Sequence, residues 1–275
     1  MTKTVTTVAE LRAALAAVRQ RRIGMVPTMG ALHEGHLSLV REAKRHADWV
    51  VVSIFINPAQ FGPGEDLDAY PRTLDGDLEK LAGRADLVFT PNAREIYRPG
   101  HATTVSVDGP SSGLETDFRP HFFSGVATVV AKLLIAASPD IAVFGEKDYQ
   151  QLQVVRRMVH DLALPVEIIG SPTVREADGL ALSSRNAYLT PDERRIAGRL
   201  NVILKEAIVH TRQGDLRGAE GWAVNALQDA GFDSVDYVAI RDAETLAPVT
   251  TTERPARILA AARVGKTRLI DNMAV

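Results

Sequence analysis

Short apolar runs alternate with helical segments through the first two-thirds of this chain. The runs are rich in β-branched residues and cover residues 23–26, 49–56, 87–89, 141–144 and 166–169. Strands that are apolar on both faces are typical of a parallel sheet covered by helices on each side. Segments with apolar residues at helical spacing lie between them, at 36–47, 74–82, 125–137 and 149–162. This order predicts right-handed βαβ units and a doubly wound α/β sheet.

The pattern changes after Ser171-Pro172-Thr173, which divides the chain into predicted domains at residues 1–173 and 174–275. Thr190-Pro191-Asp192-Glu193 is typical of a helix start, with threonine as N-cap, proline at N1 and glutamate at N3. The runs 235–241, 258–262 and 268–273 alternate like antiparallel strands with one covered face. We therefore expect a smaller α+β domain hinged on the first.

Composition limits what the chain binds. The net charge of −2 and the isoelectric point near 6.4 do not favour the basic face of a nucleic-acid-binding protein. The chain has no cysteine, which excludes thiolate chemistry and fits a reducing cytoplasm. No apolar run approaches the length of a membrane span, and Thr7 to Glu10 read as a helix capping box. We expect a cytoplasmic protein that binds neither nucleic acid nor membrane.

The strongest functional signal is the loop Val26-Pro27-Thr28-Met29-Gly30-Ala31-Leu32-His33-Glu34-Gly35-His36. It joins an apolar strand to a helix, and free N–H groups at a helix start can bind phosphate. Gly30 and Gly35 would allow the backbone to come close to that phosphate. His33 and His36 face the same side of the first helical turn, and their imidazoles can donate hydrogen bonds to a triphosphate in the neutral or the charged form. We interpret the loop as a nucleotide site. A metal fragment and two surface imidazoles are the alternatives, and zinc lacks a third ligand nearby.

Other polar loops follow strands that would end at the same edge of the sheet. Lys147, in Gly145-Glu146-Lys147-Asp148, is suited to neutralise a phosphate, although such a turn can equally be a solvated one. A lid that closes over a triphosphate could be formed by Ser183, Ser184 and Arg185. The alternative is that these residues belong to an ordinary polar loop without a function.

Uncharged amides follow the strand at 49–56. Asn57 and Gln60 suit a small hydroxy acid, and the acidic loop at 62–70 is long enough to form a flap. Asp75 and Asp77 could hold Mg²⁺ together with nucleotide oxygens, or could be first-turn helix acids.

Taken together, these blocks resemble one enzyme family. Six blocks resemble those of pantothenate synthetases (pantoate–β-alanine ligases) and occur in the same order. They are Val26 to His36, Ser53-Ile54-Phe55-Ile56-Asn57-Pro58-Ala59-Gln60-Phe61, Tyr70-Pro71-Arg72-Thr73, Phe144 to Leu152, Asp178 to Asn186 and Arg268 to Asn272. The resemblance extends to the nucleotidyltransferase superfamily, whose His-x-Gly-His and Ser-Ser-Arg elements are similar to those of class I aminoacyl-tRNA synthetases. It implies a Rossmann-like domain with a smaller lid domain, assembled as a homodimer.

The resemblance also implies a reaction and a set of residues. ATP with Mg²⁺ would convert pantoate to pantoyl adenylate, releasing pyrophosphate, and β-alanine would then displace AMP. The implied catalytic residues are His36, His33, Lys147, Ser183 and Ser184. The implied ATP contacts are Met29, Gly30, His33, Gly35, His36, Gly145, Glu146, Lys147, Asp148, Val174, Leu182, Ser183, Ser184 and Arg185. Gln60 and Gln151 match pantoate-binding glutamines, Asn57 and Tyr70 match β-alanine contacts, and Asp77 is the candidate Mg²⁺ ligand.

Two positions depart from the family pattern. In Arg119-Pro120-His121-Phe122, phenylalanine stands where histidine is usual and His121 comes one position early. Gly76 stands where relatives often carry an acid, which leaves Asp77 as the metal candidate.

Three other functions compete with the ligase. A related nucleotidyltransferase with a phosphorylated acceptor would need more Arg and Lys around the acceptor than Asn57, Gln60 and Gln151 provide. A nucleotide sensor without turnover would not need the intact set of His33, His36, Lys147 and Arg185. An RNA-binding relative of the synthetases is disfavoured by the acidic balance.

Overall fold

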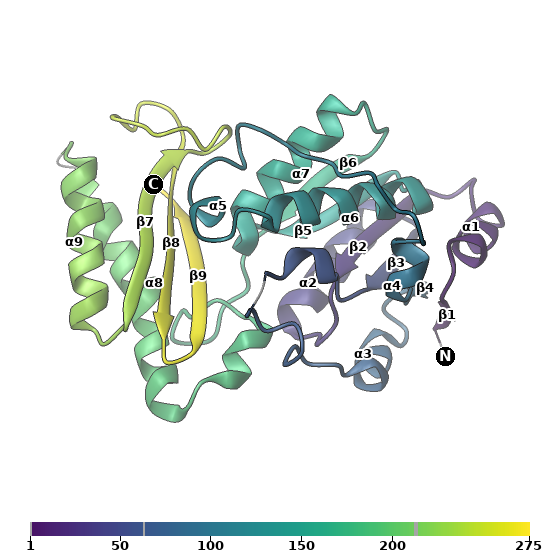
Figure 1. The fold of residues 1–275 in the computed structure, drawn as a ribbon, viewed down its shortest axis with the longest axis horizontal. Coiled ribbons are helices and arrows are strands. Elements are labelled where there is room, and N and C mark those ends of the chain that lie inside the picture. Colours follow the sequence, from purple (N-terminus) through teal and green to yellow (C-terminus); the bar gives the residue numbers. More distant parts are fainter. Residues whose placement is uncertain (1, 63, 212–213) are drawn as a thin grey trace.

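The computed structural model describes residues 2–62, 64–211 and 214–275, and within them it shows two sheets (Figure 1). The larger is parallel, in the order β1-β4-β3-β2-β5-β6, with strands at Lys3–Val5 (β1), Ile23–Thr28 (β2), Trp49–Ile54 (β3), Leu87–Phe89 (β4), Ile141–Gly145 (β5) and Glu167–Ser171 (β6). The smaller is antiparallel, with strands at Ser234–Asp242 (β7), Ala256–Val264 (β8) and Thr267–Ala274 (β9). The predicted α/β fold with a separate antiparallel sheet is confirmed.

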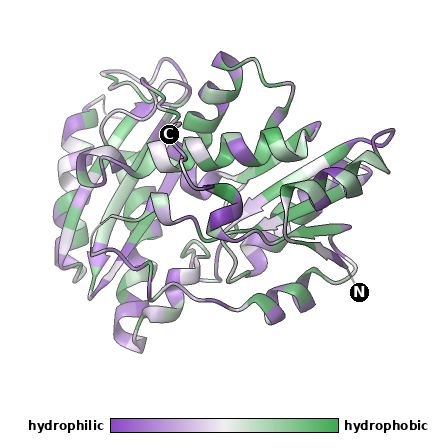
Figure 2. Cartoon of the chain, turned by 45° about the vertical axis from the view of Figure 1, so that its right-hand side comes forward, coloured by the Kyte–Doolittle hydropathy of each residue, from purple (hydrophilic) through white to green (hydrophobic). Residues whose placement is uncertain are grey.

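Helices cover both faces of the parallel sheet. One apolar cluster packs α1 (Val8–Ala16), α6 (Phe122–Ala137) and α7 (Tyr149–Asp161) on one face, and a second packs α2 (Glu34–His46) and α3 (Leu74–Leu81) on the other. The strands between them are mostly hydrophobic along their length (Figure 2). Two short helices, α4 (Ala93–Ile96) and α5 (Glu115–Phe118), lie in the long connection before α6. Burial on both faces is the reason why these strands read as unbroken apolar runs.

The smaller sheet has its own core and also contacts the larger domain. Helices α8 (Pro191–Thr211) and α9 (Leu216–Asp229) pack against β7 to β9 around a separate apolar cluster. Ala239 and Leu259 of the smaller sheet instead join the cluster beneath α6 and α7. The division at residues 173/174 stays a prediction, since the chain leaves β6 at Ser171 and crosses to the second sheet from there. No helix in the described ranges is long and apolar enough to cross a membrane.

The parallel register places three loops at one edge of the sheet. β2 pairs with β3 from Ile23 and Trp49 onward, and β2 pairs with β5 at Gly24 and Ile141. The carboxyl ends of these strands therefore lie together, as the positions of their polar loops predict. Each loop leads into a short turn or helix that carries polar side chains: α2, η1 (Pro58–Gln60) and η2 (Glu146–Asp148).

Candidate active site

A cavity of about 1230 Å³ opens at this edge, between the two sheets. Single small-molecule pockets are usually about 300–1,000 Å³, so this one has room for more than one ligand. Most of the residues that the sequence singled out line it: Met29, His33, Gly35, His36, Gln60, Tyr70, Gly145, Lys147, Asp148, Gln151, Val174, Leu182, Ser183, Ser184 and Arg185. Four others are not among its lining residues: Gly30, Asn57, Asp77 and Glu146.

His33 and His36 hold each other in place at the start of α2. The His33 N–H donates to Nδ1 of His36 at 3.3 Å, and the Gly35 N–H donates to Nδ1 of His33 at 3.2 Å. When Nδ1 accepts a hydrogen bond, the proton of a neutral imidazole lies on Nε2. A Cβ on Gly35 would lie 2.9 Å from the His33 ring, so this pairing requires glycine there. The pair thus provides two Nε2–H donors at the cavity wall.

Both imidazoles are neutral at pH 7. Burial is the main cause, and it lowers the pKa of His36 to about 3 and that of His33 to about 4. The positive charges of Lys147 and Lys80 lower the pKa of both rings further. The sequence left neutral and charged forms open, and the structure favours neutral donors.

Asp77 fixes the loop before α2, and its assignment as a metal ligand stays a prediction. Its carboxylate is only 1% exposed and accepts the N–H groups of Ala31 and Leu32, each at 2.8 Å. The Thr73 hydroxyl donates to the same carboxylate at 3.3 Å. Both carboxylate oxygens are occupied, because Asp77 closes a turn in which Ala31 has a positive φ of 49°. Asp77 is also not among the residues that line the cavity.

The backbone of this loop has a different role from the one expected. The N–H groups of Ala31 and Leu32 bind Asp77, that of Gly35 binds His33 Nδ1, and that of His36 binds the His33 carbonyl at 2.8 Å. These amides are therefore not available to a phosphate. The side-chain donors that line the cavity include the two imidazoles, Lys147 and the hydroxyls of Ser183 and Ser184.

Gln60 is held by Asn57. The Asn57 side chain is 1% exposed; its Nδ2 donates to Gln60 Oε1 at 2.9 Å and to the Gly125 carbonyl at 3.1 Å. Its Oδ1 accepts the Tyr97 hydroxyl at 2.6 Å. All its polar atoms are used, so Asn57 orients Gln60, and its contact with β-alanine stays a prediction. Gln60, with Oε1 taken, presents its NH₂ group to the cavity.

Close packing beneath Gln60 depends on one glycine. A Cβ on Gly125 of α6 would lie 2.2 Å from the Ala59 carbonyl oxygen, so η1 can approach α6 only if residue 125 has no side chain.

Two neighbouring glutamines of α7 have separate roles. Gln150 is 4% exposed and binds the carbonyls of Pro110 and Gly113 and the Glu115 N–H, which makes it structural. Gln151 lines the cavity. Tyr70 also lines the cavity, and burial raises the pKa of its hydroxyl, which stays protonated at neutral pH.

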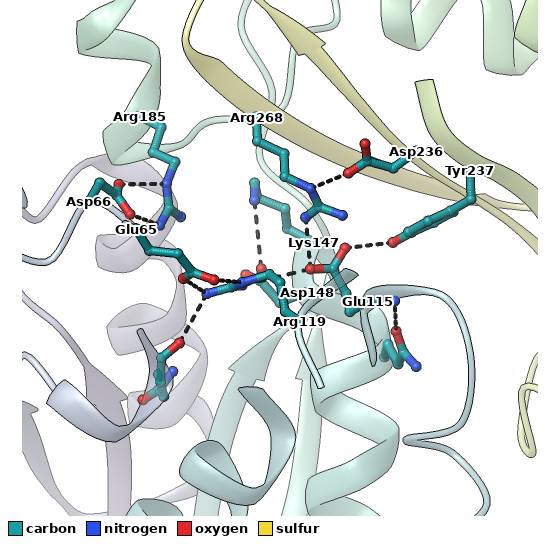
Figure 3. A network of polar contacts seen from close by, with 12 residues as sticks. Glu65, Asp66, Glu115, Arg119, Lys147, Asp148, Arg185, Asp236, Tyr237 and Arg268 are labelled. Atoms are coloured by element: carbon teal, nitrogen blue, oxygen red, sulfur yellow. Dashed lines mark hydrogen bonds and ion pairs between the residues drawn. The ribbon is translucent and has the colours of Figure 1, made fainter. Parts of the chain in front are cut away.

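Two acidic residues of the predicted flap contact arginines of the site. Asp66 binds the Arg185 guanidinium through two hydrogen bonds of 3.0 Å, and Glu65 binds Arg119 at 2.9 and 2.6 Å (Figure 3). Residue 63 of that loop lies outside the described residues. The Ser184 hydroxyl donates to the Ala31 carbonyl at 3.2 Å, so the lid meets the loop before α2. The flap, the lid and the sheet edge therefore meet around one cavity.

Phe122, not His121, faces the cavity. The Arg119 guanidinium lies 3.9 Å from the centre of the Phe122 ring, and both residues line the cavity. His121 packs against Gly62, where an added Cβ would lie 2.5 Å from its ring, and it is not a lining residue. The early histidine therefore does not take the place of the usual one.

Polar contacts between the two domains were not predicted from the sequence. Glu115 accepts the Tyr237 hydroxyl and Arg268 Nη1, each at 2.8 Å, and Arg268 Nε donates to Asp236 at 2.6 Å (Figure 3). The one indication in the sequence was the block Arg268 to Asn272, which is part of the family resemblance but had no predicted role. Glu115 lies more than 100 residues from Tyr237 and from Arg268 in the sequence, so no local pattern reveals these contacts.

Comparisons with known proteins agree with this geometry. The sequence profile described as Pantoate-beta-alanine ligase matches residues 3–274. The chain is 59% identical to the pantothenate synthetase of Mesorhizobium japonicum, covering 98% of this chain and 97% of that protein. It is also 59% identical to the pantothenate synthetase of Caulobacter vibrioides, covering 98% of each.

Solved structures give the same result. Pantothenate synthetase from Thermus thermophilus matches with a TM-score of 0.93 at 50% identity, over 98% of both chains. The pantoate-beta-alanine ligase from Francisella tularensis, complexed with beta-gamma ATP and β-alanine, matches with a TM-score of 0.85 at 35% identity, over 99% of this chain and 97% of that one. Because the family profile and these relatives span nearly the whole sequence, the chain belongs to the pantoate-beta-alanine ligase family.

Proposed function

We propose that the cavity joins pantoate to β-alanine in two steps. In the first, a pantoate carboxylate oxygen bonds to the α-phosphorus of ATP and the bond to the β-phosphate oxygen breaks, which gives pantoyl adenylate and pyrophosphate. In the second, the β-alanine amine bonds to the acyl carbon, the bond to AMP breaks and the nitrogen loses a proton. The observation that carries this proposal is that the imidazole pair, Lys147 and the lid serines share one cavity with Gln60 and Gln151.

The triphosphate end is assigned by its donors. His33 and His36 offer Nε2–H groups, and Lys147 offers an ammonium that lies 3.7 Å from the Asp148 carboxylate. Charge builds up on pyrophosphate as it leaves, so donors already in place stabilise the transition state more than the ground state. Neutral imidazoles suit this task because binding does not require them to take up a proton first. Met29, Gly145, Val174, Leu182, Ser183, Ser184 and Arg185 complete this end.

The pantoate end is assigned by amides and apolar side chains. Gln60 and Gln151 can hydrogen-bond the hydroxyls of pantoate, and Phe144, Val129, Val130 and Phe122 supply apolar walls for its methyl groups. The pantoate carboxylate is ionised at neutral pH, so no general base is needed for the first step. Catalysis is then mainly positioning and charge stabilisation at an in-line phosphoryl centre.

Mg²⁺, which the family resemblance implies, would be held largely by phosphate oxygens and water. No group of three or more His, Cys, Asp or Glu that could hold a metal ion occurs among the described residues, and Asp77 does not line the cavity. Mg²⁺ commonly binds through one or two carboxylates together with substrate phosphates. Asp148 lines the cavity and is about half exposed, which makes it the carboxylate available for this purpose. The ion would neutralise phosphate charge when bound.

The remaining parts of the proposal rest on the family resemblance. The substrates are small molecules, ATP, pantoate and β-alanine, rather than nucleic acid, and Tyr70 contributes to the β-alanine side of the cavity. The protein acts in the cytoplasm as a homodimer.

Incubation with ATP, Mg²⁺ and pantoate, without β-alanine, tests this function. We expect pyrophosphate to form only when pantoate is present, in an amount equal to the active sites, with pantoyl adenylate bound to the enzyme. Addition of β-alanine should then release pantothenate and AMP. Formation of ADP and phosphate, or no pyrophosphate at all, would contradict the proposal, and turnover with a phosphorylated acceptor would favour the related nucleotidyltransferase.

A further inference from the structure

The turn that carries Lys147 is held by the smaller sheet. Within η2 no side chain of the turn caps its start, and the N-cap of α7, Asp148, makes no side-chain cap bond either. Asn272, on β9, binds the carbonyl groups of the turn instead: its Nδ2 donates to the Glu146 carbonyl at 2.9 Å and to the Lys147 carbonyl at 2.8 Å. Two successive carbonyls at the catalytic edge are thus bound by one side chain from the other domain.

Asn272 is itself held on every side. It is 3% exposed, and its Oδ1 accepts Arg257 Nε at 2.5 Å. Arg257 also donates to the Glu146 carboxylate at 3.0 Å, and its guanidinium lies 3.8 Å from the centre of the Tyr149 ring. The amide plane therefore cannot turn without breaking the Arg257 contact, and a buried side chain held this firmly is a precise support.

The backbone of Asn272 is fixed in the same way. Its N–H donates to Asp271 at 2.7 Å, and its carbonyl accepts Arg175 at 3.3 Å. Arg175 and Asp271 form a two-bond ion pair of 2.7 and 2.9 Å, in which Asp271 is 2% exposed. The residue that holds the η2 turn is thus anchored to the segment that leads into the lid.

The chemistry of the contact requires an asparagine. Two donors on one nitrogen reach two carbonyls, while the oxygen accepts from Arg257. Aspartate has the same size but donates nothing when ionised, and it would place its charge against two carbonyl oxygens.

We propose that Asn272 is a positioning residue that sets the place of Lys147 in the cavity and links it to the lid domain. The inference rests on the proposed function, because it assumes that Lys147 stabilises the leaving pyrophosphate. Loss of the two bonds would let the η2 turn relax, and a displacement of about 1 Å at such a site can cost up to about 10²-fold in rate.

Single-turnover pyrophosphate release with saturating ATP, Mg²⁺ and pantoate provides the test. We expect Asn272→Ala and Asn272→Asp each to slow it by about 10- to 100-fold, while the KM for pantoate changes less than about twofold. Asn272→Asp keeps the size of the side chain and the acceptor for Arg257, so it reports on the two donated bonds even if the alanine variant folds poorly. Asn201→Ala is the matched control, because Asn201 is an equally buried amide of the same domain that does not line the cavity.

A second background separates positioning from general damage to the fold. In a Lys147→Ala enzyme, we expect Asn272→Ala to cost less than about twofold more, because the group that it positions is gone. Wild-type rates in both Asn272 variants, or an equal loss in the Lys147→Ala background, would overturn the inference. Failure of the wild-type protein to release pyrophosphate with pantoate would instead overturn the proposed function.

Discussion

At the scale of single residues, the site depends on polar groups that restrain one another. His33 and His36 form a capping box in which each ring is fixed by a backbone N–H. The consequence is a defined tautomer for both rings and a fixed direction for their Nε2–H groups. Asp77 and Asn57 support this arrangement from outside the cavity, one by fixing the loop and the other by fixing Gln60.

Removal of one imidazole donor tests the catalytic assignment. We expect His36→Ala to lower the rate of adenylate formation by about 10²–10³, the scale for loss of one preorganised donor. His46→Ala is the control, because His46 lies at the far end of the same helix and is absent from the cavity lining. A single-turnover rate within a few-fold of wild type for His36→Ala would remove this role.

The lowered pKa values of both histidines predict how stability depends on pH. The folded protein keeps His36 neutral down to a pKa of about 3, whereas an unfolded chain protonates it near pH 6.5. The unfolded state therefore binds more protons in that window, so this contribution to stability is present above pH 6.5 and is lost as the pH falls. Urea unfolding at pH 7 and pH 5 should show a larger loss for wild type than for His36→Gln. An equal loss in both proteins would contradict the neutral assignment.

At the scale of elements, the local sequence pattern predicts the strands whose residues are buried on both faces of the sheet. β2, β4 and β5, at 23–28, 87–89 and 141–145, match the runs predicted at 23–26, 87–89 and 141–144, because strands covered on both faces are mostly apolar. β1 was missed because it has three residues, two of them exposed, at the edge of the sheet. The use of the loop amides was mispredicted because the partner, Asp77, lies 46 residues away from Ala31.

The contact between η1 and α6 can be tested at Gly125. We expect Gly125→Ala to move Gln60, because the new Cβ would lie 2.2 Å from the Ala59 oxygen. The KM for pantoate should rise by about tenfold while binding of ATP changes little. Gly221→Ala, in α9 where an added Cβ meets nothing within 4 Å, should leave the KM for pantoate unchanged. An unchanged KM in Gly125→Ala would show that Gln60 does not depend on this contact.

At the scale of the whole molecule, charged side chains join the two domains around the cavity. Arg268 binds Glu115 and Arg257 binds Glu146, each across the two domains. Within the smaller domain, Arg268 also binds Asp236 and Arg175 binds Asp271. The convergence of the polar loops could be predicted from strand order, but these contacts could not, since they depend on how the second sheet docks. Asn272 and Arg268 come from one short segment of β9, which explains why the block Arg268 to Asn272 is part of the family resemblance.

The interdomain pair predicts a large effect on stability. We expect Arg268→Ala to lower the free energy of unfolding by about 3 kcal/mol, because it removes an ion-pair partner from each of two mostly buried carboxylates, Glu115 and Asp236. Arg195→Ala should change it by less than about 0.5 kcal/mol, because that arginine and its partner Asp192 are 75% and 82% exposed. Denaturant unfolding measures both, and similar values for the two variants would contradict a structural role for Arg268.

The central claim is that a pantoate carboxylate oxygen attacks the inner phosphorus of an ATP whose outer phosphates are held by the imidazole pair and Lys147. Conversion of pantoate carrying ¹⁸O in both carboxylate oxygens tests this directly by mass spectrometry of the products. We predict that one labelled oxygen appears in AMP and the other remains in the amide carbonyl of pantothenate. AMP without label, or label in inorganic phosphate formed together with ADP, would contradict the account.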